Sequence, residues 1–123
     1  MITIINYIIS LILPVTPKFV IKIFANKYIA GTNIISAIKV VKKINKSGLR
    51  ATLDILGEHT KEKIEATAIT KQYIEVLNEI YYNNLDCNIS IKPSHIGSDI
   101  KKSLLLENIS MINKKAIDTN NFI

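Results

Sequence analysis

Two charged residues, Glu58 and Lys92, stand at or just beyond the C-terminal ends of two short segments with strand-like patterning. The first segment covers residues 49–56 and the second residues 88–92. Strands that alternate with helices build α/β folds, and in α/β barrels the chemistry sits at the C-terminal ends of the strands. Glu58 and Lys92 are therefore candidates for a shared ligand site.

Both segments alternate with a period of two, which gives each predicted strand an apolar and a polar face. The expected apolar positions are Ala51, Leu53, Ile55, Ile89 and Ile91, and the polar ones are Arg50, Thr52, Asp54, Asn88, Ser90 and Lys92. Asp54 is expected to orient neighbours such as Arg50 or Thr52 rather than to act as a base. Buried parallel strands are usually apolar on both faces, so a polar face is typical of barrel strands that line a lumen. The alternative is a two-layer sheet with one face in water.

Helices are predicted before, between and after these strands. Thr32, Thr60 and Asp99 are the expected N-caps of three of them, the second running from Lys61 to about Tyr82. The buried stripe predicted for that second helix consists of Ile64, Ala68, Ile69, Tyr73, Val76, Leu77 and Ile80. The predicted order is helix, helix, β, α, β, α and the opening of a third strand at Phe122. Two strands joined by such a helix should be parallel.

The composition argues against several classes of function. The chain has 123 residues and a net charge of +6, but all except one of its sixteen basic residues are scattered lysines. No basic patch interleaved with aromatic residues appears, so no nucleic-acid partner is expected. The single cysteine, Cys87, allows no internal disulfide and is expected to be a buried, inert thiol. His59 and His95 are expected to be loop residues without ligand spacing, so no metal site is expected.

The N-terminal part has a different character from the remainder. The stretch Ile2–Leu13 is apolar but shorter than the roughly twenty residues that a membrane helix needs. It is interpreted either as a helix that packs on the domain or as an arm that touches a membrane surface. The expected organisation is an N-terminal helical arm over residues 1–47 and a βα region over residues 48–123.

Three motifs, in this order and spacing, resemble one family. They are Tyr28-Ile-Ala-Gly31, Gly48-Leu-Arg-Ala-Thr-Leu-Asp-Ile-Leu-Gly-Glu58 and Asn88-Ile-Ser-Ile-Lys-Pro-Ser-His-Ile-Gly97. From about Pro17 onward the chain resembles the N-terminal part of proline dehydrogenase, a flavin-dependent (βα)8 barrel. The fold class that the resemblance implies is α/β: the N-terminal part of a (βα)8 TIM-like barrel, preceded by helices and truncated at the start of the third strand.

The resemblance also implies an activity and roles for two residues. The family oxidises L-proline to 1-pyrroline-5-carboxylate, passes a hydride to FAD and delivers the electrons to a membrane quinone. Lys92 matches the lysine that pairs with the proline carboxylate, and Glu58 matches a carboxylate that gates the site. Asp54, on the polar face, is expected to support the gate without contacting substrate. No catalytic residue is assigned within this chain, and the residues that bind FAD are expected in later strands. The 123-residue chain alone is therefore expected to be inactive.

Other interpretations remain open at this stage. The chain could be an inactive barrel remnant that associates with a complementary C-terminal fragment, or a basic helical module on a membrane surface. Lys92 could be a solvated strand-end lysine, and Glu58 could stabilise the start of the following helix. The expected location is cytoplasmic, with peripheral contact at the inner membrane as an option.

Overall fold

The computed structural model describes Pro17 and residues 29–123, and the chain divides into two compact units, residues 1–32 and 33–123. The predicted apolar helix Ile2–Leu13 lies outside the described residues, as does nearly all of the predicted helix Lys18–Ile29. The second unit holds all the elements described below, including the helix that precedes the first strand. The expected boundary at residue 47 stays a prediction.

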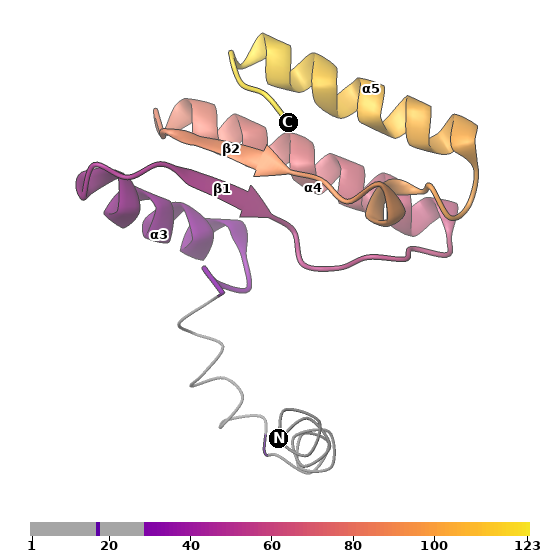
Figure 1. The fold of residues 1–123 in the computed structure, drawn as a ribbon, viewed down its shortest axis with the longest axis horizontal. Helices are drawn as coiled ribbons and strands as arrows, with labels where there is room; N and C mark the ends of the chain where they lie inside the picture. The colour runs from indigo at the N-terminus through magenta and orange to yellow at the C-terminus, as the bar shows by residue number, and fades with distance from the viewer. Residues whose placement is uncertain (1–16, 18–28) are drawn as a thin grey trace, which may run out of the picture. The chain divides into compact units, whose positions relative to one another are not determined.

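The second unit has the order α, β, α, β, 3₁₀, α (Figure 1). Its elements are α3 (Ile34–Lys46), β1 (Ala51–Asp54), α4 (Lys63–Tyr82), β2 (Cys87–Ser90), the 3₁₀ helix η2 (Pro93–Ile96) and α5 (Lys102–Asp118). Within residues 29–123 no helix is long and apolar enough to cross a membrane. The alternation of helix and strand from α3 to α5 agrees with the predicted order, but the strand expected to open at Phe122 is not formed, because residues 121–123 pair with neither strand.

The two strands pair in parallel, as predicted, with Ala51 opposite Cys87, Leu53 opposite Ile89 and Asp54 opposite Ser90. Both strands are shorter than the segments expected from the alternation. The alternation itself is confirmed, because burial alternates along β1 and along β2. The pairing and the polar face fit the barrel interpretation and the two-layer alternative equally, so the barrel stays a prediction.

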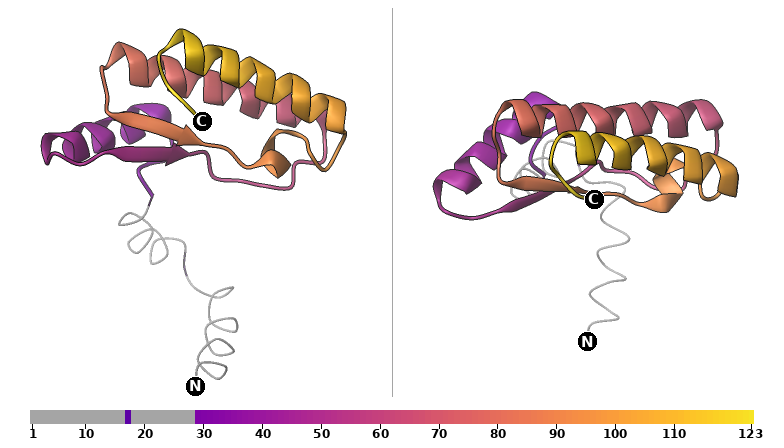
Figure 2. Two further views of the ribbon diagram at one scale, coloured as in Figure 1. Left: turned by 45° about the horizontal axis from the view of Figure 1, so that its top comes forward. Right: turned by 90° about the horizontal axis from the view of Figure 1, so that it is seen from above.

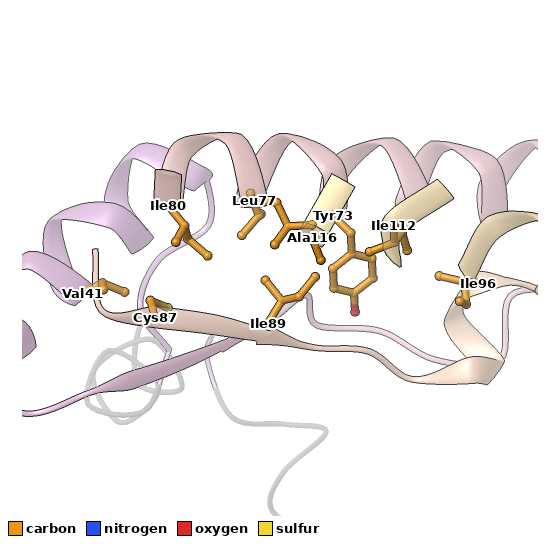
Figure 3. Close-up of a cluster of buried hydrophobic side chains, with 10 residues drawn as sticks. Val41, Tyr73, Leu77, Ile80, Cys87, Ile89, Ile96, Ile112 and Ala116 are labelled. Carbon is orange, nitrogen blue, oxygen red and sulfur yellow. The ribbon is translucent and has the colours of Figure 1, made fainter. Parts of the chain in front are cut away.

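The helices cover one face of the strand pair (Figure 2). Figure 3 shows the core between these layers, where side chains from α3, α4 and α5 meet the inward residues of β2. The core cluster consists of Val41, Tyr73, Val76, Leu77, Ile80, Cys87, Ile89, Ile96, Ile112 and Ala116. The other face carries Thr52, Asp54, Asn88 and Ser90, so the apolar surface is buried on the helix side alone.

Two helix caps differ from the prediction because their side chains have partners elsewhere. Thr60 was expected to cap α4, yet α4 begins at Lys63 and Thr60 is buried in a contact with a neighbouring loop. Asp99 was expected to cap α5, yet α5 begins at Lys102 and Asp99 pairs with His59.

The N-cap of α3 was also predicted one residue too early. It is Asn33, not Thr32, and its Oδ1 accepts a hydrogen bond of 2.9 Å from the Ser36 amide. An asparagine satisfies an orphan amide of the first turn as well as a threonine does, so residue type alone did not decide between these neighbours.

The buried stripe of α4 is confirmed from Ile69 to Ile80 but differs from the prediction in the first turns of the helix. Ile64 and Ala68 were expected in the core, but both are exposed, and Ile64 keeps 77% of its surface accessible. Ala66 and Thr70 take the buried positions instead, one turn apart on the face that continues through Tyr73. The hydroxyl of Thr70 is satisfied within the helix by the Ala66 carbonyl at 2.8 Å, which lets a polar residue occupy an inward position.

Candidate functional site

Side chains from both strands meet on the polar face along three successive pairs of positions. Near the start of the strands, the Arg50 guanidinium pairs with Asp86 at 2.9 Å. In the middle, Thr52 Oγ1 donates to Asn88 Oδ1 at 2.7 Å. The parallel register therefore produces a ladder of polar pairs between the strands.

The last pair of this ladder joins Asp54, the final residue of β1, to Lys92, two residues beyond β2. Lys92 Nζ donates to Asp54 Oδ2 in an ion pair. Both side chains keep over a third of their surface accessible, 37% for Lys92 and 39% for Asp54, so solvent still reaches the pair. The prediction that Asp54 orients Arg50 or Thr52 was wrong, because Arg50 pairs with Asp86, just before β2, and Thr52 pairs with Asn88 on β2.

Tyr73 joins the pair from the helix layer. It is fully buried in the middle of α4, and its hydroxyl donates to Asp54 Oδ1 at 3.3 Å. Burial, followed by the charge of Asp54 and the hydrogen bond to it, raises the pKa of Tyr73, so the phenol stays a neutral donor. The sequence identified Tyr73 as a core residue but gave no signal for its contact with Asp54.

Glu58, the other candidate, lies apart from the pair. It is exposed in the β1–α4 loop, and within residues 29–123 it makes no ion pair and no side-chain hydrogen bond. The structure thus brings two of the three candidate residues, Asp54 and Lys92, together. The third, Glu58, is exposed in the loop and contacts neither of them through its side chain.

The loop that carries Glu58 is hydrogen-bonded to the segment after β2, which includes η2. The Thr60 amide donates to the Ser94 carbonyl at 3.1 Å, and Thr60 Oγ1 donates to the His95 carbonyl at 2.8 Å. His59 Nδ1 lies 2.7 Å from Asp99 Oδ2, which adds an exposed ion pair between the same loops. These contacts hold the backbone around Glu58 against the segment that follows Lys92.

His95 is the main residue that the sequence analysis misjudged. It was expected to be an ordinary loop residue, but it is buried, with 5% of its surface accessible. Its ring lies edge-on to Tyr73 at a centroid distance of 6.5 Å, and its Nδ1 has no hydrogen-bond partner within the described part of the chain. Burial, followed by the charge of Lys92, lowers the pKa of His95 and favours the neutral ring. An isolated histidine in a loop motif carries no local signal for such a position.

Gly57 allows the close approach of the β1–α4 loop to His95. Its φ is +144°, and a Cβ built on it would lie 2.5 Å from His95 Nε2. The imidazole has little room to withdraw, because it is buried and the His95 amide donates to the Lys92 carbonyl at 2.9 Å. Glycine is therefore required here by both backbone conformation and space.

No cluster of three metal-binding side chains occurs among residues 29–123. A cavity of about 470 Å³ opens on the outer face of α4, lined by Lys63, Ile64, Thr67, Ala68 and Lys71. None of these residues lies at the strand ends, so Asp54 and Lys92 adjoin no part of this cavity. At the strand ends the Lys92 ammonium offers hydrogen-bond donors and a positive charge to which a carboxylate can bind.

Comparison with known proteins finds relatives by sequence. No family model matches the chain. The chain is 36% identical over 88 residues to proline dehydrogenase 1 of Bacillus subtilis subsp. natto, which covers 72% of this chain and 29% of that protein. It is 31% identical over 91 residues to proline dehydrogenase 2 of Bacillus subtilis strain 168, covering 74% and 30%. It is 28% identical over 102 residues to the proline dehydrogenase of Deinococcus radiodurans, covering 80% and 33%.

The described residues thus combine helices with two parallel strands, and a charged pair lies at the carboxyl ends of these strands. Its matches show a family relationship with the proline dehydrogenases, as the resemblance of its motifs indicated. The chain spans about a third of the length of the curated relatives it matches.

The contact between Gly57 and His95 leads to a first prediction. Gly57→Ala should lower the free energy of unfolding by about 1–3 kcal/mol for backbone strain and by about a further 1–3 kcal/mol for crowding. Gly48→Ala is the matched control, because Gly48 also has positive φ (+76°) but a Cβ there meets nothing within 4 Å. That control should be destabilised by the backbone strain alone, which costs about 1–2 kcal/mol. Urea denaturation measures both, and equal losses would show that the imidazole moves aside freely.

The pKa of His59 should lie above 6.5, the ordinary value for histidine, and the pKa of His95 should lie below it. The hydrogen bond to Asp99 raises the pKa of His59, so its contribution to stability is present below pH 6.5 and is lost as the pH rises through the folded pKa. The same contact lowers the pKa of Asp99, whose contribution is present above pH 3.8 and is lost as the pH falls through its folded pKa. The pair thus stabilises the fold most between these limits. The lowered pKa of His95 has the opposite effect to that of His59: with respect to His95, the fold is more stable above pH 6.5 than at acid pH.

Proton NMR titration of the imidazole resonances checks this prediction. Asp99→Asn should return the pKa of His59 toward 6.5 and leave that of His95 unchanged. Two histidines that titrate together near the ordinary value would contradict both the ion pair and the burial of His95.

Proposed function

We propose that the chain is the N-terminal part of a FAD-dependent proline dehydrogenase, which oxidises L-proline to 1-pyrroline-5-carboxylate and passes the electrons to a quinone. The observation that carries the proposal is the ion pair between Asp54 and Lys92, in a chain whose relatives are named proline dehydrogenase. In this proposal the two strands are the first strands of a (βα)8 barrel, and their polar face lines its lumen.

Lys92 binds the carboxylate of L-proline. Its ammonium group has three donors, so it can keep Asp54 with one of them and offer the others to a substrate. Asp54 also neutralises the lysine when no substrate is bound. The side chain is accessible enough for a small anion to reach it, at 37% of its surface.

Glu58 is proposed to act at the entrance of the proline site and not at the reacting atoms. It is exposed in a loop whose backbone is fixed by Thr60 and Gly57, so its carboxylate extends from a rigid base. Such a group can pair with a cation from another segment when the site closes. FAD, once bound, supplies the acceptor for the hydride, and the remainder of a complete enzyme holds it.

An inactive remnant is the second candidate function. In that case the chain would not support proline oxidation even when the remainder of a proline dehydrogenase is joined to it. The experiment below separates the two candidates.

The test is a chimera in which this chain replaces the matching segment of proline dehydrogenase 1 of Bacillus subtilis. It should bind FAD and oxidise L-proline, while the 123-residue chain alone, mixed with FAD, should not. Lys92→Met in the chimera should raise KM for L-proline about ten- to a hundredfold, because a charge-assisted hydrogen bond contributes roughly 1.5–3 kcal/mol. Lys114→Met, at an exposed position on α5, is the matched control and should leave KM unchanged.

Two results would contradict the proposal. A chimera that binds flavin but does not oxidise proline would favour the inactive remnant. An active chimera in which Lys92→Met changes neither KM nor kcat would show that Lys92 is only a solvated residue at a strand end.

A further inference from the structure

Tyr73 connects the buried helix layer with the charged pair on the polar face. Its ring lies in the core below α4, with its oxygen pointing toward the sheet (Figure 3). The hydroxyl donates to Asp54 Oδ1 at 3.3 Å. Asp54 is the last residue of β1 and also pairs with Lys92, so the hydroxyl lies at the C-terminal end of the strands.

Asp54 has different partners for its two carboxylate oxygens. Oδ1 accepts from the buried Tyr73 hydroxyl, and Oδ2 accepts from the Lys92 ammonium. An exposed ion pair on its own holds a long lysine side chain poorly, because ordering it costs rotamer entropy. A hydrogen bond from a buried core group to the other oxygen limits the rotation of the carboxylate, so the carboxylate presents a better-defined position to the ammonium.

We propose that Tyr73 is a positioning residue that holds Asp54, and through Asp54 holds the Lys92 ammonium at the C-terminal end of the strands. His95 supports the ring of Tyr73 from the side in an edge-on contact. A carboxylate ligand therefore meets an ammonium group that is already in place. Less conformational entropy of the lysine is lost on binding, so the affinity is higher. The role toward substrate rests on the proposed function, whereas the order of Lys92 does not.

The order of Lys92 is measurable directly on the 123-residue chain. In a sample with isotope-labelled lysine, NMR gives the rate at which the Lys92 ammonium protons exchange with water. Tyr73→Phe keeps the ring and removes the hydroxyl, and should raise this rate roughly two- to tenfold, the range that corresponds to one ordinary hydrogen bond. Tyr82→Phe is the matched control on the same helix, since Tyr82 is 76% exposed, and should leave the rate unchanged.

A second variant separates positioning from general loosening of the fold. Asp54→Asn should raise the exchange rate by itself, and adding Tyr73→Phe to it should then have no further effect on Lys92. A replacement of Tyr73 by 3-fluorotyrosine, a stronger donor of nearly the same size, should slow the exchange without creating a cavity. An unchanged rate in Tyr73→Phe, or an equal effect of that substitution with and without Asp54→Asn, would overturn the proposal.

The same substitution in the chimera distinguishes this inference from the proposed function. If Lys92 binds the proline carboxylate, Tyr73→Phe should raise KM about two- to tenfold with a smaller change in kcat. Faster ammonium exchange with an unchanged KM would support the positioning role and contradict the substrate role of Lys92. A raised KM with unchanged exchange would overturn the positioning role instead.

Discussion

The in-register parallel pairing of β1 and β2 is the constraint on which the rest of the structure depends. Because side chains alternate along a strand, a slip of one residue would exchange the polar and apolar faces of one strand. In the observed register Leu53 and Ile89 face the helices together, while Asp54 and the extension of β2 that carries Lys92 share the other face. Burial of the apolar side under three helices therefore also fixes which charged groups meet.

A second set of contacts fixes the loops at the same end of the strands. The backbone and side chain of Thr60 bind carbonyl groups of the loop after β2, and Gly57 lies directly on the imidazole of His95. His95 in turn contacts the ring of Tyr73, whose hydroxyl reaches Asp54. The charged pair is thus supported from the core and from the loops, although its own side chains remain partly accessible. A site built this way can be solvated and still be well positioned.

The sequence predicted those features that have a local signal. The period of two along residues 49–56 predicted the faces of β1, and the length of the intervening helix predicted a parallel pair, which the structure confirms. The features that it missed depend on residues 35–40 positions apart, such as the contacts of Thr60 with His95 and of His59 with Asp99. Cap-like residues in those loops were assigned to the nearest helix, because nothing local shows that a partner exists in another loop. The burial of Ala66 and Thr70 in the first turns of α4 was missed for a related reason. An isoleucine at position 64 satisfied the apolar pattern, and only the packed sheet shows which side of these turns faces inward.

Disulfide trapping of the strand register tests the central claim most directly. In a Cys87→Ala background, Thr52→Cys combined with Asn88→Cys places two thiols at paired positions whose native side-chain oxygens lie 2.7 Å apart. Neighbouring strands are about 4.8 Å apart, within the range that a disulfide spans, so this variant should form a crosslink within one chain on mild oxidation. Thr52→Cys combined with Ile89→Cys places the thiols on opposite faces and should stay reduced under the same conditions. Crosslinking of the offset pair, or a paired variant that folds but stays reduced, would contradict the register and with it the meeting of Asp54 and Lys92.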